Sequence, residues 1–240
     1  MTLLVALVGS DGLVLAADSR GTYGDPRGVT AQNDTMQKVH LVASHAVVAI
    51  AGAAELGNNV IDLAKKQMTS GGIDGVTPVM ATLRNTAISN FNEWFQSVPP
   101  IQPVGLVQMG QVATRPDLGF LIAGYDGDEA RIYNLGSQQN FAPNLNSHGF
   151  AIAGVAQYAL YLLNRLYEPG RSIQDLMSLA AYVITETAGQ DGKVGGPVMM
   201  ATIKPVEGAT VVAPEDVQGI IDRNIARHSA LKGSFYEENH

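Results

Sequence analysis

The sequence predicts a mixed α/β fold of the α+β class, with helices and antiparallel sheets. The expected architecture is a four-layer αββα sandwich in which two antiparallel sheets lie between helix pairs. Three observations predict it. Short β-prone runs occur in groups, these groups alternate with pairs of amphipathic helices, and no single helix links consecutive strands as in a parallel sheet. We expect residues 1–240 to form a single domain, because no linker or low-complexity segment interrupts the chain.

The first strand group follows the N-terminus directly. Leu3–Val8 and Leu13–Ala17 are apolar runs on either side of a glycine-containing turn, which predicts a hairpin. A polar, glycine-rich stretch, Arg20–Asp34, comes next. Two more strand-like runs, Val39–Ala43 and Ala46–Ala51, complete the group.

A change of period marks the first helix pair. Glu55–Met68 carries apolar residues on one helical face, and Gly71–Gly72 is expected to end it. Thr77 as N-cap and Pro78 in the first turn predict a second helix, which runs to about Gln96. Prolines after that point indicate a break.

The second half of the chain repeats this order. Three strand-like runs precede a second helix pair, and a further strand precedes a polar C-terminal helix. In chain order these elements are Leu118–Ala123, Ala130–Tyr133, Phe150–Ala153, Ala156–Tyr167, Ser172–Thr187, Val198–Ile203 and about Pro214–Leu231.

Composition excludes several classes of protein. The chain has 240 residues, 46% of them hydrophobic, a net charge of −7 and no cysteine. No apolar run reaches the roughly eighteen residues of a membrane span, and no basic flank indicates a signal peptide. Basic residues are scattered, whereas a nucleic-acid binder carries a basic patch. We therefore expect a cytoplasmic protein without disulfides that binds neither nucleic acid nor membrane.

Thr2 is the first candidate for chemistry. As the second residue of an ordinary protein it has no function, but removal of Met1 would give it a free α-amine. That amine titrates near ~8 and can take the hydroxyl proton, so an N-terminal threonine supplies its own base. Asp18, at the end of the second strand, and Lys38, at the start of the third, are either surface charges or a cation and its partner in the same cleft.

At this point the sequence resembles the proteasome β-subunit family, which belongs to the N-terminal-nucleophile hydrolases and has the four-layer sandwich. The spacing from Thr2 to Asp18 matches the family without a gap, whereas the stretch before Lys38 is about four residues longer. The similarity covers nearly the whole chain. The segments that carry it are Thr2, Leu13–Arg20, Gln37–Val39, Ile50–Ala54, Ala123–Asp126, Ser147, Gly154 and Asp191–Gly196.

The resemblance implies a threonine-type peptidase. By position, Thr2 would be the nucleophile and its own amine the proton acceptor. Lys38 would lower nearby pKa values, Asp18 would hold Lys38, and the backbone N–H of Gly52 would form the oxyanion hole. Glycine suits that place because the absence of Cβ lets a carbonyl approach the backbone.

Two further catalytic residues are implied, with two departures from the family pattern. Ser147 and Asp191 would support the amine. The family has serine where this chain has Val194, whose side chain can neither donate nor accept a hydrogen bond, so the surroundings of the amine lose one hydrogen bond. The residue after Ser147 is His148, which reads as a solvated loop histidine rather than a group of the site.

The resemblance also implies a specificity pocket. It would include five residues that are mostly small or apolar, so we expect cleavage after apolar or neutral residues. They are Gly21, Met36, His40, Ile50 and Ala54.

Three function classes remain open. The first is a threonine-type endopeptidase in a homo-oligomeric ring or stacked rings that takes unfolded polypeptides or peptides. The others are an N-terminal-nucleophile amidase or transpeptidase of narrow specificity and a noncatalytic structural subunit. A first strand that begins at residue 3 favours the catalytic β-type, and only methionine removal would be needed to expose Thr2.

No cofactor or metal is expected. The five histidines lack ligand spacing, and Asp126–Glu129 lacks the twelve-residue pattern of a calcium loop. No P-loop motif occurs, so energy-dependent proteolysis would need a separate ATPase unfoldase as a further candidate partner.

Overall fold

Two five-stranded antiparallel sheets form the centre of the chain. The computed structural model describes residues 2–25, 28–98 and 115–236. One sheet has the strand order β10-β1-β2-β11-β12 and the other β5-β6-β7-β8-β9, while β3 and β4 form a separate hairpin. The strands of the first sheet are β1 (Leu3–Val8), β2 (Leu13–Ala17), β10 (Phe150–Gly154), β11 (Met199–Lys204) and β12 (Gly208–Val211). The remaining strands are β3 (Gly21–Asp25), β4 (Gly28–Asn33), β5 (Val39–Ala43), β6 (Ala46–Gly52), β7 (Leu118–Asp126), β8 (Glu129–Gly136) and β9 (Asn144–Asn146).

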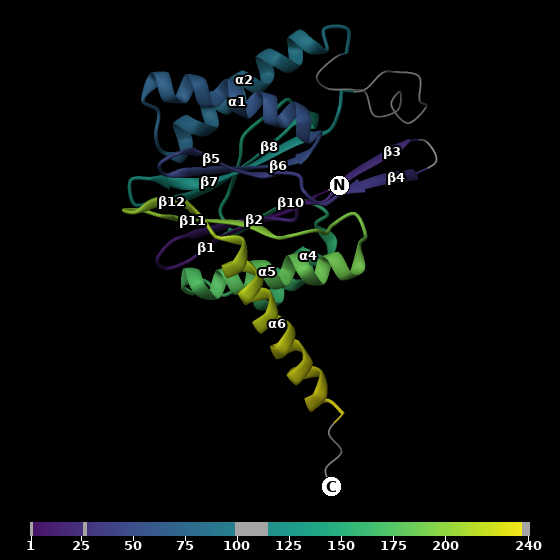
Figure 1. Ribbon diagram of the computed structural model, residues 1–240. Coiled ribbons are helices and arrows are strands. Elements are labelled where there is room, and N and C mark those ends of the chain that lie inside the picture. The colour runs from purple at the N-terminus through teal and green to yellow at the C-terminus, as the bar shows by residue number, and fades with distance from the viewer. Residues whose placement is uncertain (1, 26–27, 99–114, 237–240) are drawn as a thin grey trace.

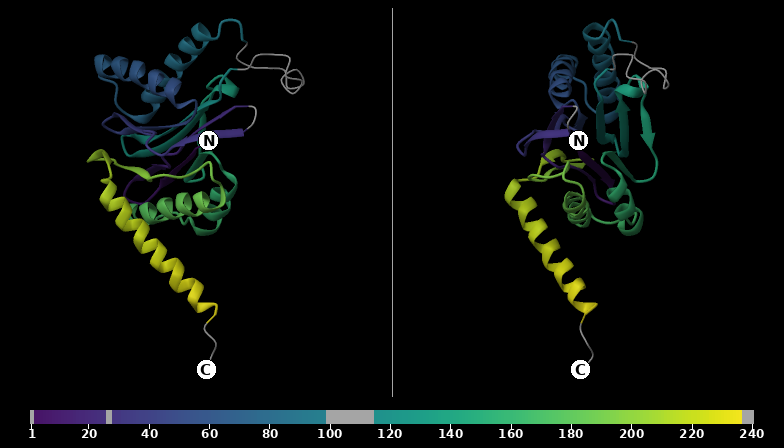
Figure 2. Two further views of the ribbon diagram at one scale, coloured as in Figure 1. Left: turned by 45° about the vertical axis from the view of Figure 1, so that its right-hand side comes forward. Right: turned by 90° about the vertical axis from the view of Figure 1, so that its right-hand side faces the viewer.

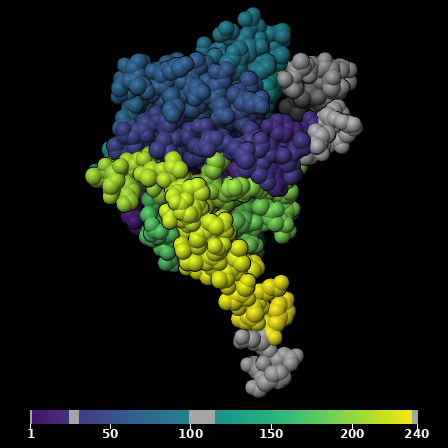
Figure 3. All heavy atoms as spheres, in the orientation of Figure 1, coloured from purple at the N-terminus to yellow at the C-terminus, as the bar shows by residue number. Residues whose placement is uncertain are grey.

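Five α-helices lie in the described part of the chain. Helices α1 and α2 pack on the outer side of the β5–β9 sheet, and α4 and α5 pack on the outer side of the other sheet (Figure 1). Helix α6 contacts α5 and β11. Its contacts with α5 extend to His228, whose ring lies beside that of Tyr182, and the end of the helix projects away from the body (Figures 2 and 3). The helices are α1 (Ala54–Gly71), α2 (Val76–Trp94), α4 (Gln157–Leu166), α5 (Ile173–Gln190) and α6 (Pro214–Ser234); a short 3-10 helix spans Ser137–Gln139.

Burial on both faces explains why β1 is a continuous apolar run. Leu3, Val5 and Leu7 belong to the hydrophobic cluster under α4 and α5. Leu4 and Ala6, which alternate with them, belong to the cluster between the two sheets. Successive side chains of a strand point to opposite faces, so a strand covered on both sides must be apolar throughout. Thr2 therefore begins a strand that is fixed from both sides.

The predicted α+β class is confirmed, with mixed helices and antiparallel sheets. The strands predicted at Leu3–Val8, Leu13–Ala17 and Val39–Ala43 have these bounds in the structure. The other predicted strands and helices are present with ends shifted by a few residues. Gly72 ends α1 in the left-handed conformation, with φ of 59°, as expected of a glycine C-cap. The break predicted after α2, at Pro99 and Pro100, lies outside the described residues.

Four strands and one cap differ from the sequence prediction. The polar stretch after Asp18 forms the β3–β4 hairpin, and two short strands, β9 and β12, were not predicted. The prediction that Thr77 is the N-cap of α2 is wrong, because the helix begins at Val76 and Gly75 is the cap residue. Asp126, at the end of β7, accepts the backbone N–H of Thr77 at 3.1 Å and its hydroxyl at 2.5 Å. A carboxylate from another element thus takes over the capping.

Replacing Asp126 with alanine is expected to lower the free energy of unfolding by about 1 to 2 kcal/mol, the usual cost of losing a helix cap. Chemical denaturation followed by circular dichroism measures it. Asp128→Ala is the matched control, because Asp128 lies in the same turn and is exposed. The control is expected to change stability by about 0.5 kcal/mol or less. Equal effects of the two variants would contradict capping by Asp126.

Candidate active site

Thr2 lies where two cavities meet. The smaller has a volume of about 340 Å³ and the larger about 720 Å³, and Thr2 and Gly52 line both. Thr2 itself is only 5% exposed. The smaller cavity is further lined by Arg20, Gly21, Thr22, Tyr23, Met36, Lys38, Ala53, Ala54, Glu55 and Leu56. The hydroxyl-bearing residue at the start of β1 is therefore held in place with space on two sides.

A buried ion pair stands beside Thr2. Asp18 follows β2 and Lys38 precedes β5, and both are almost completely buried. The Nζ of Lys38 lies 2.7 Å from Oδ1 of Asp18 and donates to the carbonyl oxygen of Arg20 at 2.7 Å. Burial lowers the pKa of the Lys38 ammonium, and the charge of Asp18 opposes that shift. An ammonium has three N–H bonds, so one is left for a group in the cavity.

The Asp18 carboxylate is surrounded by donors. Its Oδ1 accepts the backbone N–H of Leu3 at 3.0 Å in addition to Lys38. Its Oδ2 accepts the backbone N–H groups of Arg20, at 3.2 Å, and Gly195, at 3.0 Å. These bonds tie the Thr2 end of β1, the end of β2 and the segment after α5 to one side chain. These donors satisfy the buried carboxylate and fix its position.

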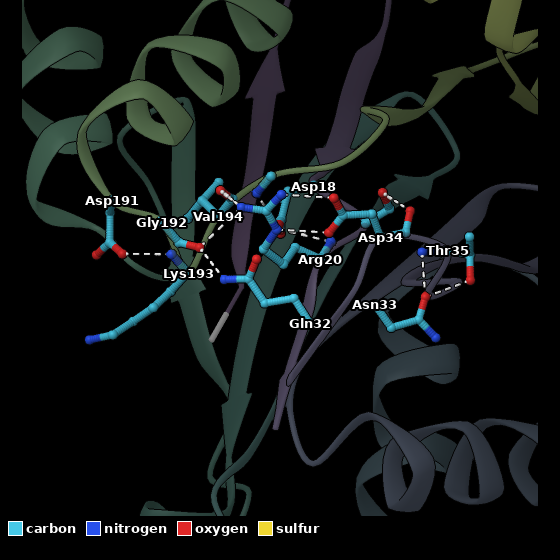
Figure 4. A network of polar contacts seen from close by, with 12 residues as sticks. Asp18, Arg20, Gln32, Asn33, Asp34, Thr35, Asp191, Gly192, Lys193 and Val194 are labelled. Carbon is cyan, nitrogen blue, oxygen red and sulfur yellow. Dashed lines mark hydrogen bonds and ion pairs between the residues drawn. The ribbon is translucent and has the colours of Figure 1, made fainter. Parts of the chain in front are cut away.

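An ion pair between Arg20 and Asp34 fixes the base of the β3–β4 hairpin. Nε and one terminal nitrogen of Arg20 each lie 2.7 Å from an Asp34 oxygen, a bidentate geometry. The other terminal nitrogen donates to the carbonyl oxygen of Gly192 at 3.1 Å. The pair raises the pKa of Arg20 and lowers that of Asp34 through their hydrogen bonds. Figure 4 shows this network running from Asp34 to the segment around Gly192.

This ion pair was not among the predicted site residues. The sequence does contain a signal for the pair, because the polar stretch begins with Arg20 and ends with Asp34. A hairpin brings its two ends together, so recognition of β3 and β4 would have predicted that the two charges meet.

Two glycines beside Thr2 adopt a backbone conformation that other residues avoid. Gly52 ends β6 with φ of +88°, and a Cβ there would collide with the carbonyl oxygen of Asp117. Gly154 ends β10 with φ of +90°, and a Cβ there would collide with the carbonyl oxygen of Thr2. The neighbouring Val155 donates its backbone N–H to that same oxygen at 2.8 Å. Both positions therefore demand glycine for space and for conformation.

Ser147 does not join this group. Strand β10 is antiparallel to β1, with Gly154 opposite Leu3 and Phe150 opposite Leu7. Ser147 precedes β10. The carbonyl oxygen of Gly149, the residue directly before that strand, accepts the backbone N–H of Val8. The serine therefore lies at the far end of β1 from Thr2 and is exposed, as is His148. The implied support of the amine by Ser147 has no geometric basis here.

The carboxylate of Asp191 accepts a hydrogen bond within its own segment of the chain. Asp191 is the C-cap residue of α5, and its Oδ1 accepts the backbone N–H of Lys193 at 2.9 Å. In Figure 4 it stands at the opposite end of the network from Asp34. Its carboxylate shapes the turn that delivers the N–H of Gly195 to Asp18.

Three of the five residues predicted for the specificity pocket line the smaller cavity, namely Gly21, Met36 and Ala54. Ile50 and His40 are not among the lining residues. Ile50 is fully buried in the cluster under α1 and α2. His40 lies opposite Val48, which packs in the same cluster, so its ring is directed toward the helices. Burial lowers the pKa of His40, with a smaller effect from the Lys65 charge.

No group of three or more His, Asp or Glu side chains within the described ranges could hold a metal ion. No helix there is both long and apolar enough to cross a membrane.

Comparison with known proteins agrees with this geometry. The family model for proteasome subunits matches residues 2–91. Proteasome subunit beta 1 of Streptomyces avermitilis is 26% identical over 205 residues, which cover 85% of this chain and 67% of that protein. Proteasome subunit beta 2 of Pyrococcus furiosus is 28% identical over 210 residues, covering 84% of this chain and 86% of that protein. These matches support a proteasome β-type family member. At the family level they support hydrolase and protease function.

Solved structures agree on the fold of the chain. An Anbu (ancestral beta-subunit) from Yersinia bercovieri superimposes with a TM-score of 0.70 at 18% identity, covering 99% of this chain and 98% of that one. An Anbu mutant from Hyphomicrobium sp. strain MC1 gives 0.69 at 16% identity, covering 100% and 99%. At such identities the likeness concerns architecture alone.

The departure from the proteasome pattern at Val194 has a clear place in the structure. Its side chain is fully buried in the hydrophobic cluster under α4 and α5. Its carbonyl oxygen lies 3.5 Å from a terminal nitrogen of Arg20. Valine at this position thus packs into the core, and the backbone keeps the contact with the Arg20 network.

Proposed function

We propose that this chain is a threonine-type endopeptidase with Thr2 as N-terminal nucleophile, once Met1 has been removed. One observation carries the proposal: a buried Lys38, held by a buried Asp18, lines the same cavity as Thr2. Burying an ion pair is costly in stability, so such a pair beside a hydroxyl and an open cavity points to a catalytic role.

The chemistry follows from these positions. The Thr2 hydroxyl attacks the carbonyl carbon of the peptide bond and passes its proton to the α-amine. The Lys38 ammonium disfavours protonation of the resting amine and stabilises negative charge on the nucleophile. The backbone N–H of Gly52 stabilises the tetrahedral oxyanion. The C–N bond then breaks, the leaving amine takes the proton, and water hydrolyses the ester on Thr2.

The wider features of the family belong to the same proposal. The two sheets and their outer helices form the four-layer αββα sandwich of a single domain. Copies of the chain assemble into a closed ring or stacked rings in the cytoplasm, because an uncaged endopeptidase would endanger other proteins. The substrates are unfolded polypeptides or peptides, and a separate ATPase unfoldase delivers folded ones.

Mass spectrometry of the purified protein tests the nucleophile. Wild type is expected to lack the mass of Met1 and to gain one adduct on Thr2 from an epoxyketone or β-lactone. Thr2→Ala is expected to lose the adduct and all hydrolysis of unfolded casein, because no other side chain carries the reaction. Thr22→Ala, which changes another threonine of the same cavity, is expected to keep the adduct.

Each other outcome has a defined meaning. Retained Met1 without any adduct would refute the catalytic assignment and leave a noncatalytic subunit. An adduct on Thr2 with hydrolysis of small amides but not of casein would identify an amidase or transpeptidase instead.

A further inference from the structure

The two cations that line the smaller cavity are each paired with an aspartate outside its lining. Lys38 is paired with Asp18. The guanidinium of Arg20 binds both oxygens of Asp34 and also faces the carbonyl oxygens of Gly192 and Val194. The Arg20 guanidinium is not available to a carboxylate of a substrate unless it gives up these partners, and Lys38 already has the Asp18 carboxylate as its counter-ion.

Glu55 differs from them. It lies in the first turn of α1, lines the smaller cavity and is exposed. In the part of the chain that the structure describes, no hydrogen bond or ion pair involves its carboxylate, whereas the other charged lining side chains are bound. The unbalanced charge of this cavity, among those residues, is therefore negative.

Part of the wall of the same cavity is apolar, formed by Met36, Ala54 and Leu56. Met36 packs against Gly21 so closely that a Cβ there would collide with the methionine sulfur. Ala54 is buried and Leu56 is half-buried. A lysine or arginine side chain suits such a cavity, because its aliphatic stem packs on apolar surface while its charged end reaches the rim.

We propose that the smaller cavity binds a lysine or arginine side chain of the substrate, with Glu55 as the residue that determines this specificity. The inference rests on the proposed function, which makes this cavity the specificity pocket beside Thr2. It replaces the expectation of cleavage after apolar or neutral residues. That expectation rested on small and apolar positions and did not include Glu55.

Fluorogenic peptides that differ only in the residue before the scissile bond test the proposal. The set contains arginine, glutamine, leucine or glutamate at that position. For wild type, kcat/KM is expected to be about fivefold higher for arginine than for glutamine, the upper range for an exposed ion pair. Glu55→Gln is expected to bring this ratio close to one, and Glu55→Lys to favour the glutamate peptide. Raised salt should reduce the wild-type ratio, because it screens exposed charges.

Glu215→Gln is the matched control. Glu215 is an exposed glutamate in the first turn of α6, so its replacement removes the same charge from the same kind of helix position. It is expected to leave the arginine preference intact. A ratio that stays at its wild-type value in Glu55→Gln, or a wild type that prefers leucine, would overturn the inference while Thr2 labelling still supports the proposed function. Hydrolysis of none of the peptides, with no adduct on Thr2, would overturn both.

Discussion

Replacing Asp18 with alanine is expected to lower the free energy of unfolding by about 3 to 5 kcal/mol, the cost of leaving a buried charge without its partner. Lys38 is 1% exposed and would lose its counter-ion. The backbone N–H groups of Leu3, Arg20 and Gly195 would lose an acceptor. Urea denaturation at neutral pH measures the change. The variant is also expected to lose the adduct on Thr2.

Asp34→Ala provides the comparison. Asp34 also pairs with a cation near the cavity, but its side chain is 41% exposed. Exposed pairs contribute about 0 to 1 kcal/mol, so the loss should be several times smaller than for Asp18→Ala. The double variant Asp18→Asn with Lys38→Met should recover part of the stability, because no unpaired charge remains. If Asp18→Ala costs no more than Asp34→Ala, Lys38 does not depend on Asp18 in the way we describe.

The sequence predicted those elements whose pattern is set locally. Strands β1 and β2 are buried on both faces and therefore appear as continuous apolar runs with sharp ends. The β3–β4 hairpin gives no such signal, because it forms its own two-stranded sheet outside the main core and is polar and rich in glycine. The cap of α2 was missed for another reason: the capping carboxylate of Asp126 comes from 49 residues further along the chain. The residues around the start of α2 cannot indicate a contact with a residue so distant in the sequence.

The residues of the candidate site likewise fall into those that could be predicted from the sequence and those that could not. Asp18 directly follows β2 and Lys38 directly precedes β5, strands of the two different sheets, and their meeting could be expected from strand alternation and the family resemblance. The role of Ser147 was implied by the family resemblance. Antiparallel pairing of β10 with β1 moves each residue before Gly154 further from Thr2, so the structure does not bring Ser147 and Thr2 together. Glu55 belongs to none of the motifs found in the sequence. It becomes a candidate only because it lines the smaller cavity.

Replacing Gly154 with alanine is expected to lower the free energy of unfolding by about 2 to 5 kcal/mol and to abolish the adduct on Thr2. The loss combines about 1 to 3 kcal/mol of backbone strain at positive φ with a similar cost of overpacking. The new Cβ collides with the carbonyl oxygen of Thr2, and the chain at either position must move. Because Val155 binds the same oxygen, movement of β10 also weakens that hydrogen bond.

Gly170→Ala separates the two contributions. Gly170 has φ of +85°, close to the +90° of Gly154, but a Cβ there meets no atom within 4 Å. This control should therefore show the backbone strain without the collision and should keep the adduct on Thr2. Both variants are compared at a temperature at which circular dichroism shows them folded. A folded Gly154→Ala variant that is labelled at the wild-type rate would mean that β10 does not position the nucleophile. A variant that is folded but unlabelled would mean that the reactivity of Thr2 depends on the close approach of a glycine 152 residues further along the chain.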